Sequence, residues 1–110
     1  MTAQRFRRIA LGLPGAVESA HGGHPDFRVG GKVFASLGYP DEALGMVKLT
    51  PDEQRVLVEA EPKIFRPVPG GWGKMGWTTA TLAELGTREL KDALELAWRR
   101  AQPKIGRAHV

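Results

Sequence analysis

The side chains best suited to bind a ligand lie in two segments that carry positive charge and no negative charge. The first wing, residues 27–40, has two basic residues; the second wing, residues 62–83, has three and a tryptophan close to a lysine. Cations on projecting segments can hold phosphates, and an aromatic ring can stack on a base or pack on a sugar. The wings therefore predict a nucleic-acid-binding surface. The candidate contact residues are Arg28, Lys32, Arg66, Trp72 and Lys74.

A simpler interpretation of the wings stays open. Lysine and arginine are also common at hairpin tips, where they are solvated and protect the edges of a sheet from other strands. Local charge and motif context indicate nucleic-acid binding without establishing it.

A second candidate, for metal binding, is the short histidine spacing near residue 24. His21, His24 and Asp26 could each donate to a metal, but Gly22–Gly23 and Pro25 predict a loop here rather than a helix that would align them. Such spacings are unspecific when no fourth ligand is evident. We therefore expect no metal site.

The third candidate is the glycine-rich run at residues 70–76, which superficially resembles a phosphate-binding loop. Val68 stands where that motif needs its first glycine, and Met75 stands where it needs Ser or Thr. The only serines, Ser19 and Ser36, lack the glycine neighbours of a hydrolase nucleophile. We expect no catalytic residues and no cofactor.

Length and composition predict one small domain. The chain has 110 residues, of which 42% are hydrophobic and 25% charged, and it has no cysteine. The lack of cysteine suits a reducing cytosol, and no apolar run is long enough for a signal peptide or a membrane span. We expect a soluble, cytoplasmic monomer that does not associate with membranes. Its domain should cover residues 1–103, and residues 104–110 should form a disordered basic tail.

The net charge of +4 belongs to the ends of the chain. Seven of the 16 Lys and Arg residues lie in residues 1–8 and 99–107, whereas residues 9–98 hold nine basic and twelve acidic residues. The high isoelectric point therefore says little about a nucleic-acid surface, and the wings are basic segments within an acidic interior.

Three helices and several strands must position these residues. The sequence predicts helices over residues 2–11, 50–60 and 87–102; the second begins with a capping box of Thr50 and Glu53, and the third has apolar residues at a 3.6-residue period. Gly30–Gly31 predicts a tight hairpin that sets Phe27 opposite Phe34. Other predicted extended segments are 17–21, 44–49, 63–65 and 76–82, with a loop over 67–76.

The order of these elements predicts the fold class. Most connections between strands are too short for a crossover helix, so the strands must pair mainly in an antiparallel manner. We expect an α+β domain, with a largely antiparallel sheet packed against helices on one face.

The sequence also resembles the MmcQ/YjbR family. The resemblance is carried by residues 13–15, the run Gly-His-Pro-Asp-Phe-Arg-Val-Gly-Gly-Lys-Val-Phe-Ala at 23–35, Lys48, residues 50–54 and the segment 62–77. It implies a CyaY-like fold and a "double wing" that has been suggested to bind DNA. Residues 68–72 and Thr78–Thr79 depart from the family pattern.

Together these observations predict a small non-catalytic binding module whose partner is DNA, held by the two wings. The alternative is an interaction domain that binds a protein, a peptide or a small anion through the same basic surface. An unrecognised enzyme ranks last, because no nucleophile, base and orienting group come together in the sequence.

Overall fold

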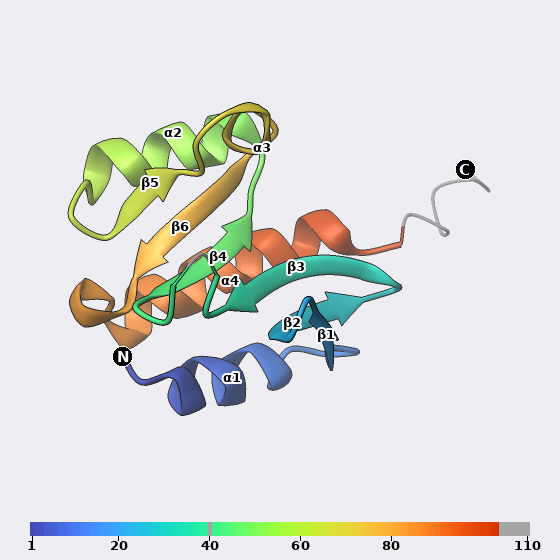
Figure 1. Ribbon diagram of the computed structural model, residues 1–110. Helices are drawn as coiled ribbons and strands as arrows, with labels where there is room; N and C mark the ends of the chain where they lie inside the picture. Colours follow the sequence, from blue (N-terminus) through green and yellow to red (C-terminus); the bar gives the residue numbers. More distant parts are fainter. Residues whose placement is uncertain (40, 104–110) are drawn as a thin grey trace, which may run out of the picture.

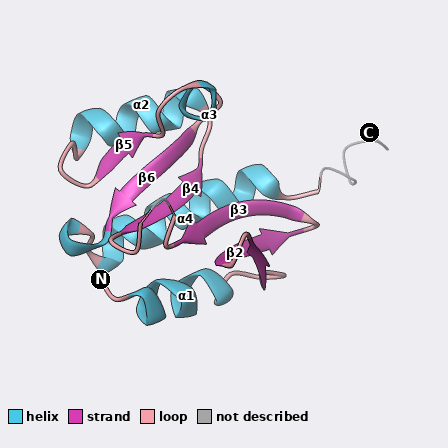
Figure 2. Cartoon of the chain, viewed as in Figure 1, coloured by secondary structure: helices cyan, strands magenta, loops and turns pink. Residues whose placement is uncertain are grey.

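Six strands form one antiparallel sheet in the order β1-β2-β3-β4-β6-β5. The computed structural model describes residues 1–39 and 41–103, so the tail predicted over 104–110 lies outside the described residues. The α+β class with an antiparallel sheet and packed helices is confirmed (Figures 1 and 2). The elements are α1 (Ala3–Leu11), β1 (Val17–His21), β2 (His24–Val29), β3 (Lys32–Leu37), β4 (Leu44–Lys48), α2 (Pro51–Ala60), β5 (Phe65–Pro67), α3 (Gly71–Lys74), β6 (Trp77–Thr81), a 3-10 turn (Leu82–Glu84) and α4 (Thr87–Ala101).

The longer helices share one face of the sheet. From α1, Phe6 packs against Phe27 of β2, with ring centroids 6.0 Å apart. From α2, Gln54 bonds to Thr78 of β6, on the same face. In Figure 1, α4 lies behind β3 and β4, so the view is onto the opposite, open face.

The helix signals in the sequence act as expected. Thr50 Oγ1 accepts a hydrogen bond from the Glu53 amide, and the Glu53 carboxylate accepts one from the Thr50 amide, so the capping box is confirmed. The apolar stripe of α4 packs into the core, where Leu90 and Leu94 are fully buried. No helix in the described part of the chain is long and apolar enough to cross a membrane.

The first half of the sheet differs from the prediction in two places. Residues 24–26, expected in a loop, continue β2 and pair with β1 across the Gly22–Gly23 turn. The ladder between β2 and β3 contains a bulge, so Phe27 pairs with Ala35 rather than with Phe34. One extra residue in β3 accounts for the shift.

The predicted loop over 67–76 contains the short helix α3, which two glycines hold against the rest of the molecule. A Cβ on Gly73 would overlap the carbonyl group of Val68, and one on Gly76 would overlap the carbonyl oxygen of Leu49. Gly76 also has a φ of 103°, which side-chain-bearing residues rarely adopt. These close backbone approaches hold α3 against the segments around Val68 and Leu49.

The amide of Gln54 adds a polar link to the same region. This side chain is 9% exposed, and its Nε2 donates to the carbonyls of Gly73 and Trp77 and to Thr78 Oγ1, at 3.0–3.1 Å. Helix α2, helix α3 and strand β6 therefore meet at one side chain.

The two edges of the sheet are unequal. Strand β1 has five residues, all exposed. Strand β5 at the other edge has three residues and ends at Pro67, which has no amide hydrogen to donate.

We predict that Gly76→Ala lowers the free energy of unfolding by about 2–4 kcal/mol, because the new methyl group meets a backbone oxygen at a strained φ. Chemical denaturation measures the change. Gly71→Ala is the matched control, since no atom lies within 4 Å of its Cβ position, and it should be nearly neutral. Equal stability of the two variants would show that the backbone contact is not limiting.

Candidate nucleic-acid interface

The projecting parts of the two wings, the β2–β3 turn and α3, lie at one end of the sheet. Lys32 begins β3, Lys48 ends β4 and Trp77 begins β6, and antiparallel pairing brings these positions to the same end. Figure 1 shows two projections there, the β2–β3 turn at the right and α3 at the top, with the end of α4 between them. The C-terminal end of α4 also touches the first wing, because a Cβ on Gly30 would lie 2.7 Å from Pro103.

Arg28 is the one predicted contact residue whose charge is already matched. Its Nε and Nη2 donate to the two carboxylate oxygens of Asp26, at 2.9 and 3.0 Å. Asp26 is 2% exposed, and the hydrogen bonds and charge of this carboxylate raise the pKa of Arg28. The pair lies on the open face of β2 and leaves Arg28 less able to attract a phosphate.

The other predicted cations keep their charge available. Lys32, Arg66 and Lys74 are exposed, and none of them forms an ion pair within residues 1–39 and 41–103. Arg66 stands on the edge strand β5, and its carbonyl accepts a hydrogen bond from Thr79. The structure thus places one such cation on the first wing and two on the second.

Trp72 is the most exposed large apolar side chain of the described residues, at 63%. It extends from α3, and its ring meets Trp77 in an edge-to-face arrangement with centroids 6.3 Å apart and planes at 66°. Met75, at the end of α3, is also largely exposed. The second wing therefore carries an aromatic and apolar surface beside its cations.

Sequence reasoning missed Lys48, which lies under this surface. Lys48 pairs with Trp77 across the sheet, its Nζ donates to the Met75 carbonyl, and it lies 5.9 Å from the centroid of the Trp77 ring. A cation over an aromatic face is an attractive arrangement. The order β4-β6 creates this contact, and the sequence between the strands gives no direct signal of it.

Lys48 is a nearly buried cation without a carboxylate partner. It is 8% exposed and belongs to none of the ion pairs formed by the described residues. Burial and, secondarily, the positive charge of Arg100 lower the pKa of Lys48 from its ordinary value of 10.5. The base of the second wing therefore has positive potential that the protein itself does not neutralise.

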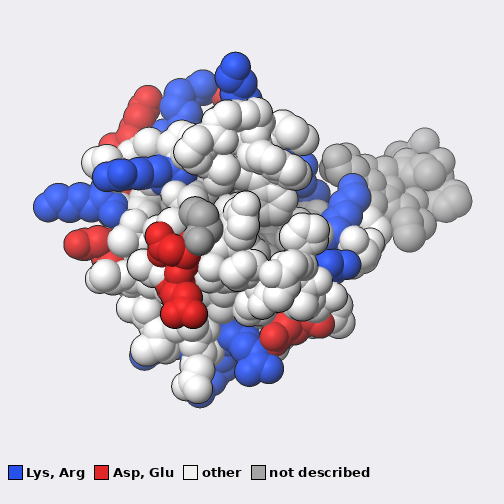
Figure 3. Space-filling model, viewed as in Figure 1, with Lys and Arg blue, Asp and Glu red and all other residues white. Residues whose placement is uncertain are grey.

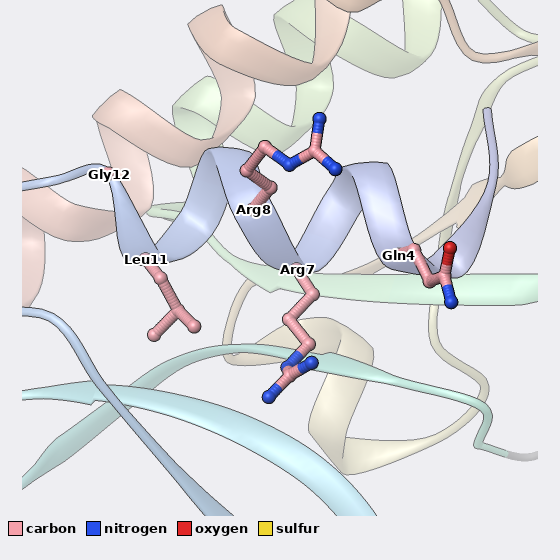
Figure 4. A pocket seen from close by; sticks show the side chains of 5 residues that line it. All are labelled: Gln4, Arg7, Arg8, Leu11 and Gly12. Carbon is pink, nitrogen blue, oxygen red and sulfur yellow. The ribbon is translucent and has the colours of Figure 1, made fainter.

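Away from the wings, the main surface hollow lies on α1. Figure 4 shows the side chains that line it, with Arg7 and Arg8 pointing to different sides of the helix. Arg7 is held by Glu18 of β1. The two guanidinium groups therefore do not converge on a shared ligand.

Among the described residues, no three His, Asp or Glu side chains are grouped as a metal site would require.

Figure 3 shows the charges on the open face of the sheet. Lys and Arg side chains lie mainly around the rim, and the middle is largely uncharged apart from a small acidic group. The pairing register of the strands explains why the middle of this face has little charge. One row of paired residues across the sheet carries mostly neutral side chains. This row is Ser19, Asp26, Ser36, Met46, Thr79 and Arg66.

We predict that Lys48→Met is as stable as the parent protein or more stable at pH 7, because it removes a desolvated charge. The lowered pKa means that the folded protein binds fewer protons than the unfolded chain between that pKa and 10.5. The parent should therefore gain stability as pH rises through this window, and the variant should lack this gain.

Urea denaturation of both proteins from pH 7 to pH 10 measures the difference. As pH rises, the free energy of unfolding of the parent should increase relative to that of the variant. A variant that is much weaker at pH 7, with an unchanged pH slope, would show that the Met75 hydrogen bond outweighs the buried charge.

Comparisons with known proteins place the chain by family and fold. The YjbR family model matches residues 11–100. A crystal structure of a Deinococcus radiodurans protein with a DUF419 domain superposes with a TM-score of 0.72 and 21% identity, over 87% of this chain and 75% of that one. A Pseudomonas syringae protein superposes with a TM-score of 0.66 and 19% identity, over 92% and 99%. No curated protein matches the chain.

Proposed function

The chain belongs to the YjbR family, and from this premise and the geometry of the wings we propose that it is a small non-catalytic module that binds DNA. The observation that carries the proposal is the placement of Lys32 on the β2–β3 turn and Lys74 on α3, at one end of the sheet, with Arg66 on the edge strand β5. None of the three forms an ion pair with a described residue. A cytoplasmic location goes with this proposal.

Phosphate contacts explain why such cations would be useful. A lysine that binds a phosphate displaces cations condensed on the DNA, and the release of these cations to bulk solution drives association at low salt. A lysine without an internal carboxylate is free to make such a contact. Arg28 is left out of the proposed contact set, because Asp26 already accepts both of its hydrogen bonds. Lys32 on the first wing, and Arg66 and Lys74 on the second, hold the backbone.

The non-catalytic part of the proposal has its own support. Outside residues 40 and 104–110, one surface hollow is lined by residues of α1 and the glycine after it, with no acidic, histidine or serine side chain. A second hollow, between α1 and α4, has one carboxylate, Glu95, which is paired with Arg99, and no histidine or serine. A hydrolase or transferase site would need a nucleophile or a general base next to such a hollow.

We predict that Lys32→Glu/Lys74→Glu weakens DNA binding at least tenfold and flattens its salt dependence, because two phosphate contacts become repulsive. Fluorescence anisotropy with labelled DNA, over a salt series from about 20 to 200 mM, measures both effects. Arg88→Glu/Lys91→Glu is the matched control, since it changes the net charge by the same amount on the exposed side of α4.

The outcomes separate the rival functions. Equal loss in both double variants would mean that net charge, rather than the wings, governs binding. No DNA binding by the parent at low salt would remove the proposal and favour the alternative, a domain for a protein, peptide or small anion.

A further inference from the structure

Phosphate contacts do not explain why two apolar side chains of the second wing are exposed. Trp72 is 63% exposed and Met75, three residues later, is 57% exposed, although both could pack inward in a module that needed only charge. Contiguous exposed apolar surface on a small domain is a common mark of a binding site. The question is what chemistry would cover a tryptophan in this setting.

The position of Trp72 is fixed rather than loosely tethered. Its helix, α3, contains Gly73 and is followed by Gly76, and the backbone approaches of these glycines to Val68 and Leu49 leave no room for side chains. The Gln54 amide holds the Gly73 carbonyl at 3.1 Å. An aromatic residue on a rigid support loses little conformational entropy when it binds a ligand.

The ring of Trp72 also has surface that Trp77 does not cover. It meets Trp77 edge to face rather than in a parallel stack, so the two indoles do not cover each other. The high exposure of Trp72 means that the remaining ring surface faces solvent. A flat, apolar ligand can therefore stack on Trp72 without any rearrangement of Trp77.

The cations of the second wing favour an anionic ligand. Lys74 follows Trp72 by two residues, and Lys48 lies against Trp77 with no carboxylate partner among the described residues. Arg100 adds a second positive charge near Lys48. Flat rings linked to negative charges are the chemistry of nucleotides.

We propose that the second wing binds single-stranded nucleic acid, with one unpaired base stacked on Trp72 and the adjoining phosphate held by Lys74. The faces of bases in a duplex are covered by their neighbours, whereas a single strand can present them to an aromatic ring. Lys48 is a positioning residue, which supports Trp77 and contributes positive potential. This inference rests on the proposed function and adds the class of nucleic acid.

The test compares a labelled oligothymidine of about 15 nucleotides with a hairpin duplex of similar charge, at one low salt concentration. Trp72→Ala should weaken binding of the single strand about tenfold or more, and Trp72→Phe should restore part of the loss. Tyr39→Ala is the matched control, because Tyr39 is 56% exposed but follows β3, at the opposite end of the sheet from the Lys32 end of the first wing and from α3. It should bind like the parent.

A fluorescence measurement gives a readout that loss of folding cannot imitate. Stacking should quench indole emission when oligothymidine is added to the parent protein. The quenching should be largely lost in Trp72→Ala, even though Trp77 and Trp98 remain. Circular dichroism and the melting temperature should be unchanged in this variant, since an exposed side chain is removed.

Three outcomes decide the inference. Preference for the single strand, with the loss confined to the Trp72 variants, supports it. Duplex binding that equals or exceeds single-strand binding, with Trp72→Ala unaffected and Lys32→Glu/Lys74→Glu impaired, overturns the inference and leaves the proposed function standing. Absence of binding to both probes overturns both.

Discussion

The arrangement of the second half of the molecule depends on the amide group of Gln54. This nitrogen donates to two carbonyls and a hydroxyl that belong to α3 and β6. Two hydrogens serve three acceptors, so one hydrogen is shared or exchanges between them. Because the site is nearly dry, an alternative side chain would leave buried carbonyls without a donor, and that loss is larger than the gain from one ordinary hydrogen bond. Through this group, the packing of α2 determines where Trp72 stands.

The two faces of the sheet have different structural roles. One face is covered by the longer helices and holds the aromatic core of Phe6, Phe27, Phe34 and Phe65. On the other face, no helix of residues 1–39 or 41–103 crosses the middle, which carries polar side chains and one partly buried ion pair, Asp26–Arg28. Stability thus comes mainly from the covered face.

Much of the fold could be predicted from local signals in the sequence. The capping box at Thr50, the glycine pair at 30–31 and the stripe of α4 each describe a contact within a few residues of the signal. The bulge that pairs Phe27 with Ala35 could not be predicted, because a hairpin turn fixes only the nearest pairs of the ladder. Residues 24–26 were placed in a loop because Pro25 weakens a strand signal, but β2 tolerates it beside β1.

The candidate site was only partly predictable. Lys32, Trp72 and Lys74 stand out in sequence by charge and residue type, and the structure places them on exposed projections. The pairing of Arg28 with Asp26 follows the two-residue period of a strand, a signal that was present but lay at the boundary of the wing. The contact of Lys48 with Trp77 needs the order β4-β6, which is a property of the whole topology.

The short edge strand β5 limits strand addition beside the exposed Trp72. An exposed tryptophan next to an open sheet edge would normally invite other chains to add strands, the first step toward aggregation. Strand β5 offers three residues, and Pro67 removes one of the few amides that an incoming strand could use. The exposed apolar surface at Trp72 therefore lies beside an edge to which other strands cannot readily add. In the binding mode we propose, contact is therefore made with the ring of Trp72, since the edge beside it gives little opportunity for backbone pairing.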